Sequence, residues 1–216
     1  MLAIPPKRFD EALITYLTEE EITALLAAPD QATWTGRRDH ALLMLACQTG
    51  LRATELTSLT IGEVRLGTGA HVSCTGKGRK QRITPLTATT TAVLSTWLAE
   101  RGGMPADTLF VTRRSTPLSR DALERRLAKY TATAAQTCPA LREKKVSPHV
   151  LRHSAAMRLL NAGVDTSVIA LWMGHYAGDL CQVDHVVVRY RRAAAAGERL
   201  SSWPISAQVW PWSRAW

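Results

Sequence analysis

The arrangement of apolar and polar positions predicts a chain that is mostly helical. Apolar runs alternate with polar positions in segments bounded by residues that begin or end helices. Thr18 with Glu21 three residues later is typical of a capping box, and Gly50 suits the position after a helix end. The predicted helices cover residues 16–29, 37–50, 52–59, 88–101, 119–136, 147–163 and 165–174.

One segment has the pattern of strands instead. Residues 71–86, HVSCTGKGRKQRITPL, contain two short strand-like runs on either side of a Gly-Lys-Gly turn, which predicts a hairpin. No linker divides the chain. The expected fold class is therefore mainly α with a small antiparallel β-sheet or hairpin, an α+β fold.

Composition and charge narrow the possible functions. The 216 residues are 46% hydrophobic, which permits a substantial core. Lys and Arg number 27 against 18 acidic residues, a formal charge of +9. This excess favours a polyanionic partner such as DNA or RNA, and the alternative is a solvated basic surface.

The cysteines and the N-terminal segment bear on the compartment. Cys47, Cys74, Cys138 and Cys181 show no C-x-x-C spacing, so we expect reduced and mostly buried thiols. The opening MLAIPPKRFDEAL has no apolar core of a secretion signal, and no stretch approaches a membrane span. We expect a cytoplasmic, nucleoid-associated protein that does not bind membranes.

The segment SPHVLRHSAAMRLL, residues 147–160, places polar side chains at the start of a predicted helix. Ser147 can cap this helix and Pro148 suits its first position. His149 and Arg152 are three residues apart and share a face near unpaired backbone N–H groups, which attract anions. The segment is a candidate phosphate site, and the alternative is a solvated surface turn.

Three further residues have the same two interpretations. Arg52, in TGLRATEL, lies between two predicted helices and can reach a cleft or pair with Glu55 or Glu63. Lys77, in TGKGRKQRITPL, lies at the predicted hairpin tip. There it can reach over the backbone of a bound ligand, or it can be an ordinary charged turn residue. His175, in LWMGH, directly follows the end of a predicted helix. It can contact a ligand, or it can cap the helix by bonding its last carbonyls.

Taken in this order, TGLRATEL, GKGRKQRITPL, HVLRH and LWMGH resemble the catalytic domain of tyrosine recombinases, the phage integrase family. The resemblance runs from about residue 16 to residue 175. It implies the fold of that catalytic domain, double-stranded DNA as partner, and neither a metal nor a nucleotide cofactor. By analogy it implies a tetramer on paired sites. The implied active-site set is Arg52, Lys77, His149, Arg152 and His175.

The chemistry of this family explains those residue types. A tyrosine hydroxyl attacks a DNA phosphodiester, and two guanidiniums grip the non-bridging oxygens while negative charge develops. The resemblance makes Lys77 the candidate general acid for the 5′ oxygen. His149 would move the proton of the nucleophile or hold the phosphate, and His175 would donate a hydrogen bond to it. The bond energy is retained in a 3′-phosphotyrosine.

The nucleophile does not occupy the usual position. The family's tyrosine lies about nine residues after the last histidine, where this chain has Asp184. Tyr176 directly follows His175, and Tyr190 precedes the helical stretch RRAAAAGERL. We predict Tyr190 as the nucleophile, and the alternative is a partly buried tyrosine on the last helix.

The remaining C-terminal residues resemble the family least. Residues 201–216, SSWPISAQVWPWSRAW, carry four of the seven tryptophans and form an expected Trp-rich tail. A shifted reading frame, a docking segment for a neighbouring protomer and a disordered tail all remain open. Residues 1–16 are the expected arm or linker remnant and residues 17–200 the catalytic domain.

These features lead to two hypotheses for function. The first is a site-specific recombinase or integrase that cleaves and rejoins DNA. The second is a catalytically impaired, DNA-binding relative that regulates or caps DNA complexes. A topoisomerase-like relaxing activity is a weaker alternative, and a plain nuclease is disfavoured because no carboxylate cluster offers a metal site.

Overall fold

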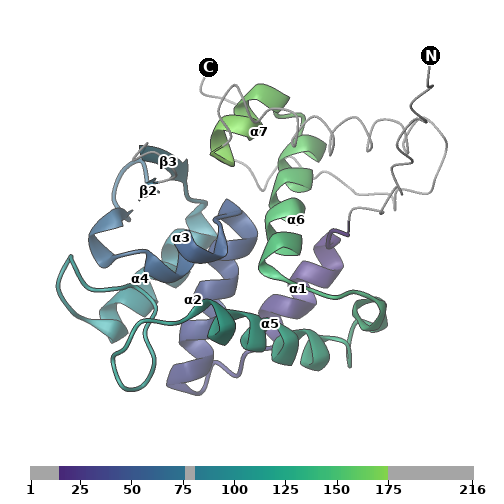
Figure 1. The fold of residues 1–216 in the computed structure, drawn as a ribbon, viewed down its shortest axis with the longest axis horizontal. Coiled ribbons are helices and arrows are strands. Elements are labelled where there is room, and N and C mark those ends of the chain that lie inside the picture. Colours follow the sequence, from purple (N-terminus) through teal and green to yellow (C-terminus); the bar gives the residue numbers. More distant parts are fainter. Residues whose placement is uncertain (1–14, 76–80, 175–216) are drawn as a thin grey trace, which may run out of the picture.

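The predicted fold class is confirmed by a computed structural model of the chain, which describes residues 15–75 and 81–174 (Figure 1). Most described residues are helical, and the strands form one antiparallel sheet. The elements in chain order are α1 Glu19–Ala27, α2 Trp34–Thr49, α3 Ala53–Ser58, η1 Ile61–Glu63, β1 Val64–Arg65, β2 His71–Thr75, β3 Gln81–Pro85, α4 Ala88–Arg101, α5 Arg120–Ala134, η3 Pro139–Glu143, α6 Pro148–Asn161 and α7 Thr166–Trp172.

Capping residues explain where the first two helices begin and end. The Thr18 hydroxyl accepts a hydrogen bond from the Glu21 N–H at 3.3 Å, and the Glu21 carboxylate accepts from the Thr18 N–H at 2.7 Å. Helix α2 begins at Trp34, before the predicted residue 37, because the Thr33 hydroxyl accepts from the Gly36 N–H at 3.0 Å. It ends at Gly50, whose φ of 63° is the left-handed conformation that glycine favours.

The sheet has the order β1-β2-β3, and both pairs are antiparallel. The predicted hairpin is β2 and β3, with Val72 opposite Thr84 and Cys74 opposite Arg82. Strand β1 was not predicted, because two residues are too few to show a period. Val72 and Cys74 face the interior, as do Arg82 and Thr84 across from them.

A large cluster of buried side chains holds most of the helices together, and a smaller one packs α7 against α6. Helix α2 packs against α4 and α6, and α3 packs against α5 (Figure 1). The Trp97 indole N–H donates to the Leu109 carbonyl at 3.1 Å, so this large ring is buried with its polar atom satisfied.

The cysteines of the described residues are unpaired thiols, as predicted. Cys47 and Cys74 are buried and Cys138 is partly buried, whereas Cys181 lies outside the described residues. Burial raises the pKa of both buried thiols to about 12, which makes them unreactive. No helix in the described ranges has the length and apolar character needed to cross a bilayer.

Candidate active site

Arg152 joins the ends of three helices. It lies in the second turn of α6, which begins where the Ser147 hydroxyl accepts from the Val150 N–H at 3.3 Å. Its buried guanidinium donates to the Gly50 carbonyl at 2.7 Å and to the Met173 carbonyl. These carbonyls belong to the residues that end α2 and α7. Helix ends carry unpaired carbonyls and partial negative charge, so a buried cation is well placed there.

This junction is tightly packed around Gly50. A Cβ added there would lie 2.9 Å from the Met173 Cε and 3.1 Å from the Ala155 Cβ. The left-handed backbone of Gly50 adds a second restriction. The close contact of α2, α6 and α7 around Arg152 therefore depends on glycine at this position.

Arg52 lies at the same junction, two residues after Gly50, and begins α3. Its guanidinium pairs with Glu55 at 3.2 Å, so the ion pair considered as an alternative does form. The Arg52 side chain nevertheless remains 40% exposed, which leaves its guanidinium accessible to a ligand.

The two candidate arginines act on each other electrostatically. Burial, and next the positive charge of Arg52, lower the pKa of Arg152 to about 10. Arg152 therefore stays charged at neutral pH, and the two cations share one region of the molecule. Two neighbouring cations repel, and an anion bound between them relieves that repulsion. The structure thus brings together the two guanidiniums that the sequence places 100 residues apart.

Glu55 and Arg82 complete this region, and neither was predicted as a site residue. The Arg82 guanidinium donates to both oxygens of Glu55, at 2.8 and 2.7 Å. Burial acts to raise the pKa of Glu55, but hydrogen bonds from Arg82 and the Arg52 N–H, with their charges, lower it to about 2. Glu55 is therefore ionised at neutral pH.

The burial pattern of strand β3 explains why Arg82 was not predicted as a site residue. Alternation along this strand places Arg82 inside and leaves Ile83 62% exposed. This is the reverse of the usual arrangement, in which the apolar residue faces the core. Its partner Glu55 lies 27 residues earlier, and burial of that carboxylate, which creates the need for a buried cation, shows only in the structure.

His149 forms a pair with a second histidine, His153. Their Nε2 atoms are 2.6 Å apart, one turn of α6 from each other. His149 is exposed, whereas His153 is partly buried. Burial, then His149 and Arg152, lower the pKa of His153 to about 4, so His153 is neutral at neutral pH. The short contact requires one proton between the rings, donated by one nitrogen and accepted by the other.

The remaining predicted site residues lie outside the described residues. These are Lys77, between the end of β2 and the start of β3, and His175, Tyr176 and Tyr190 beyond α7. Gly174, the last described residue, has a φ of 66° and directly precedes His175.

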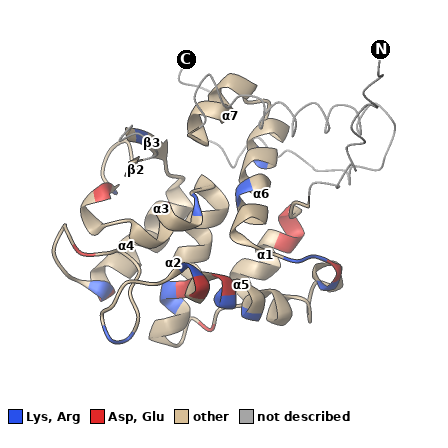
Figure 2. Ribbon diagram, viewed as in Figure 1, with Lys and Arg blue, Asp and Glu red and all other residues tan. Residues whose placement is uncertain are grey.

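The basic residues between positions 113 and 145 fall into two groups. Some form ion pairs within the chain: Arg126 with Asp39, Lys144 with Glu21 and Arg120 with Glu124. Others are exposed without a described ion pair, namely Arg113, Arg114, Arg125, Lys129, Arg142 and Lys145. Figure 2 shows basic positions on α5 and α6, with acidic positions among them near α2 and α5.

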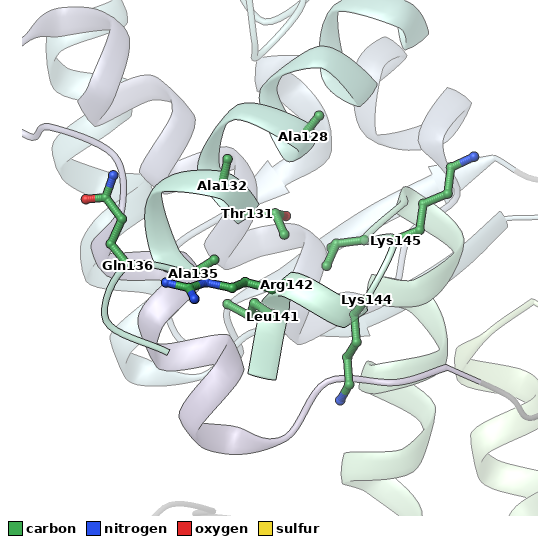
Figure 3. A pocket seen from close by; sticks show the side chains of 10 residues that line it. Ala128, Thr131, Ala132, Ala135, Gln136, Leu141, Arg142, Lys144 and Lys145 are labelled. Carbon is green, nitrogen blue, oxygen red and sulfur yellow. The ribbon is translucent and has the colours of Figure 1, made fainter. Parts of the chain in front are cut away.

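A hollow of about 510 Å³ lies between α5 and η3 (Figure 3). None of the predicted site residues that the structure describes lines it, and its wall combines small side chains with basic ones. The lining residues are Ala128, Thr131, Ala132, Ala135, Gln136, Leu141, Arg142, Lys144, Lys145 and Val146.

Comparisons with known proteins give a consistent result. The model of the phage integrase family matches residues 15–195. A putative integrase/recombinase, y4rC of Sinorhizobium fredii (strain NBRC 101917 / NGR234), is 49% identical over 183 residues, 85% of this chain and 55% of its own length. Tyrosine recombinase XerD of Xanthomonas campestris pv. campestris is 36% identical over 197 residues, 86% of this chain and 59% of its own.

A solved structure has the same fold. The XerH site-specific recombinase, bound to a palindromic difH substrate in a post-cleavage complex, matches with a TM-score of 0.72 and 26% identity. The match covers 86% of this chain and 53% of that one. This chain therefore spans a little over half the length of the relatives that it matches.

Proposed function

Because the chain belongs to the phage integrase family, we propose that it cleaves and rejoins double-stranded DNA at specific sites through a 3′-phosphotyrosine intermediate. The convergence of Arg52 and Arg152 at the ends of α2, α3 and α6 is the observation that supports this most directly. Two guanidiniums in one region match the two non-bridging oxygens of one phosphate. The DNA-bound XerH structure supports DNA as the partner.

In the proposed reaction, the hydroxyl of Tyr190 attacks the phosphorus and the bond to the 5′ oxygen breaks. Lys77 gives a proton to that leaving oxygen, and His149 takes or passes on the tyrosine proton. Arg52, Arg152 and His175 donate to the phosphate oxygens while their negative charge grows. Attack by another strand's 5′-hydroxyl reverses these steps and rejoins the DNA.

The proposed assembly follows from the same reasoning. The phosphodiester energy is kept in the phosphotyrosine, so rejoining needs no nucleotide hydrolysis. The protein would act on the nucleoid, in the cytoplasm, as a tetramer on paired sites. We propose residues 17–200 as the catalytic domain.

Covalent trapping tests the proposal directly. A randomised library of nicked duplexes, from which the cleaved 5′ end diffuses away, is incubated with the protein, and the covalently attached DNA is sequenced. Wild type and Tyr176→Phe are expected to form an adduct, and Tyr190→Phe is expected to form none. Loss of the adduct in Tyr176→Phe alone would assign the nucleophile to Tyr176 instead.

The position of the tyrosine favours a second candidate function. Asp184 stands nine residues after His175, and Tyr190 stands fifteen after it. A relative without a reachable nucleophile would bind DNA and regulate or cap its complexes. Retained DNA binding without any adduct in the trapping assay would select this function.

A further inference from the structure

We propose that Arg82 is a positioning residue for the anion site: by binding Glu55, it keeps the guanidinium of Arg52 available to a phosphate. The proposal rests on the proposed function only for the identity of the anion as a DNA phosphate. Arg82 does not itself contact the anion in this proposal. It acts through Glu55.

The carboxylate of Glu55 accepts hydrogen bonds from both Arg82 and Arg52. Oε1 accepts from Arg82 Nη1 at 2.8 Å and from Arg52 Nη1 at 3.2 Å. Oε2 accepts from Arg82 Nη2 at 2.7 Å and from the Arg52 backbone N–H at 2.7 Å. Arg82 thus holds the carboxylate with two short, parallel bonds, which is the strong geometry for this pair. The Arg52 guanidinium has one longer bond to it.

The side chains of Arg82 and Arg52 also differ in burial, and the one with the stronger bonds to Glu55 is the more buried. The side chains of Arg82 and Glu55 are 8% and 9% exposed, whereas that of Arg52 is 40% exposed. A buried, well-aligned pair keeps its partners in place, while an exposed arginine retains the freedom to turn toward another anion. The carboxylate therefore orients Arg52 through its backbone N–H and only weakly through its guanidinium.

Removal of the Arg82 charge changes this balance. Glu55 would remain a buried carboxylate, and a buried charge without its partner is costly. Arg52 is the nearest cation whose side chain can turn to it, because it already donates to Oε1. Its guanidinium would then bind both carboxylate oxygens and be withdrawn from the phosphate.

The surroundings of Arg82 fix it in this role. A Cβ added at Gly174 would lie 2.5 Å from Arg82 Nη1, so the chain at the end of α7 passes directly against the guanidinium. Helix α7 also packs against β3. Arg82 is therefore enclosed between α3 and the residue that precedes His175.

The test measures the binding of inorganic phosphate to the intact chain. Side-chain Nε–Hε resonances of the arginines are followed by NMR while phosphate is added, and the Arg52 signal is assigned by its loss in Arg52→Lys. Arg82→Gln is compared with Arg82→Lys and with the double variant Glu55→Gln/Arg82→Gln. The matched control is Arg37→Gln, which breaks a bidentate pair with Glu100 at the opposite end of α2.

We expect Arg82→Gln to weaken the phosphate response of Arg52 about tenfold, in line with one charge-assisted bond. The double variant should recover most of the wild-type affinity, because the neutral amide that replaces the Glu55 carboxylate no longer withdraws Arg52. Arg82→Lys should fall between them, and Arg37→Gln should match wild type. If Arg82→Gln does not fold, the double variant and Arg82→Lys still make the comparison.

Three results would overturn the assignment: wild-type affinity in Arg82→Gln, equal losses in the single and double variants, or no phosphate response of Arg52 in wild type. Equal losses would indicate a purely structural ion pair. An Arg52 response with the expected variant pattern, but no covalent DNA adduct, would refute the proposed function and leave the role of Arg82 intact.

Discussion

The pair His149–His153 makes stability depend on pH in a predictable direction. Burial, followed by the effects of His149 and Arg152, lowers the pKa of His153 to about 4, from 6.5 for a free histidine. The unfolded chain therefore binds a proton at this residue between pH 6.5 and 4, where the folded chain does not. Stability due to the neutral ring is fully present above pH 6.5 and is lost as the pH falls toward 4.

The magnitude follows from these two pKa values. Each pH unit between them corresponds to about 1.4 kcal/mol, which gives an upper limit of about 3 kcal/mol. The ring is only partly buried, and solvent screening lowers the contribution to about 1–2 kcal/mol. His153→Gln keeps a hydrogen-bonding side chain but does not titrate, so it should be less sensitive to acid by this amount.

Urea unfolding of both proteins at pH 7.5, 6.0 and 5.0 measures this difference. The range ends one pH unit above the folded-state pKa of about 4, so it covers about three fifths of the effect, and the free energy of unfolding of wild type should fall by about 1 kcal/mol more than that of His153→Gln. His149→Gln is the matched control. It removes a smaller cause of the lowered His153 pKa and leaves the burial of His153, the largest cause, in place, so it should retain most of the wild-type pH dependence. Parallel curves for wild type and His153→Gln would refute the reasoning.

Three further predictions concern the buried polar contacts. Asp39→Ala removes the acceptor of Arg38, Arg126 and Tyr130 and should cost about 3–5 kcal/mol in urea unfolding, because Arg38 is left buried; a cost below 1 kcal/mol would contradict this. Gly174→Ala should destabilise by about 1 kcal/mol or more, since φ is 66°, and an unchanged melting temperature would argue against it. Arg152→Gln should slow adduct formation by about 10²–10³-fold with little change in non-specific DNA binding, and wild-type rates would exclude Arg152 from the site.

Local signals were sufficient to predict most of the fold. The predicted caps Thr18 and Ser147 each accept the expected backbone hydrogen bond, and the helices predicted to start at residues 119 and 165 likewise begin with caps, Ser119 and Asp165. These contacts span only two or three residues, so the sequence alone specifies them. Strand β1 depends on pairing with β2 and has no local signal of its own.

The site was predictable only in part, because its partners are distant in the sequence. Arg52 and Arg152 were identified from their short motifs, and the structure brings them together. The link from Glu55 to Arg82 crosses 27 positions, and no local pattern marks it. The His149–His153 pair is one helical turn apart and was within reach of a spacing argument. Lys77, His175 and Tyr190 stay predictions, since they lie outside the described residues.

The surroundings of Arg152 explain how a buried cation is tolerated at the proposed anion site. A guanidinium with few water contacts is costly unless its donors are satisfied. Here the last carbonyls of α2 and α7 accept from it, and carbonyls at a helix end have no partner within their own helix. The same contacts fix the ends of both helices, the first of which leads directly to Arg52. The residue proposed to bind the phosphate therefore also sets the position of its neighbour, so the contacts that hold this junction together also place both proposed phosphate ligands.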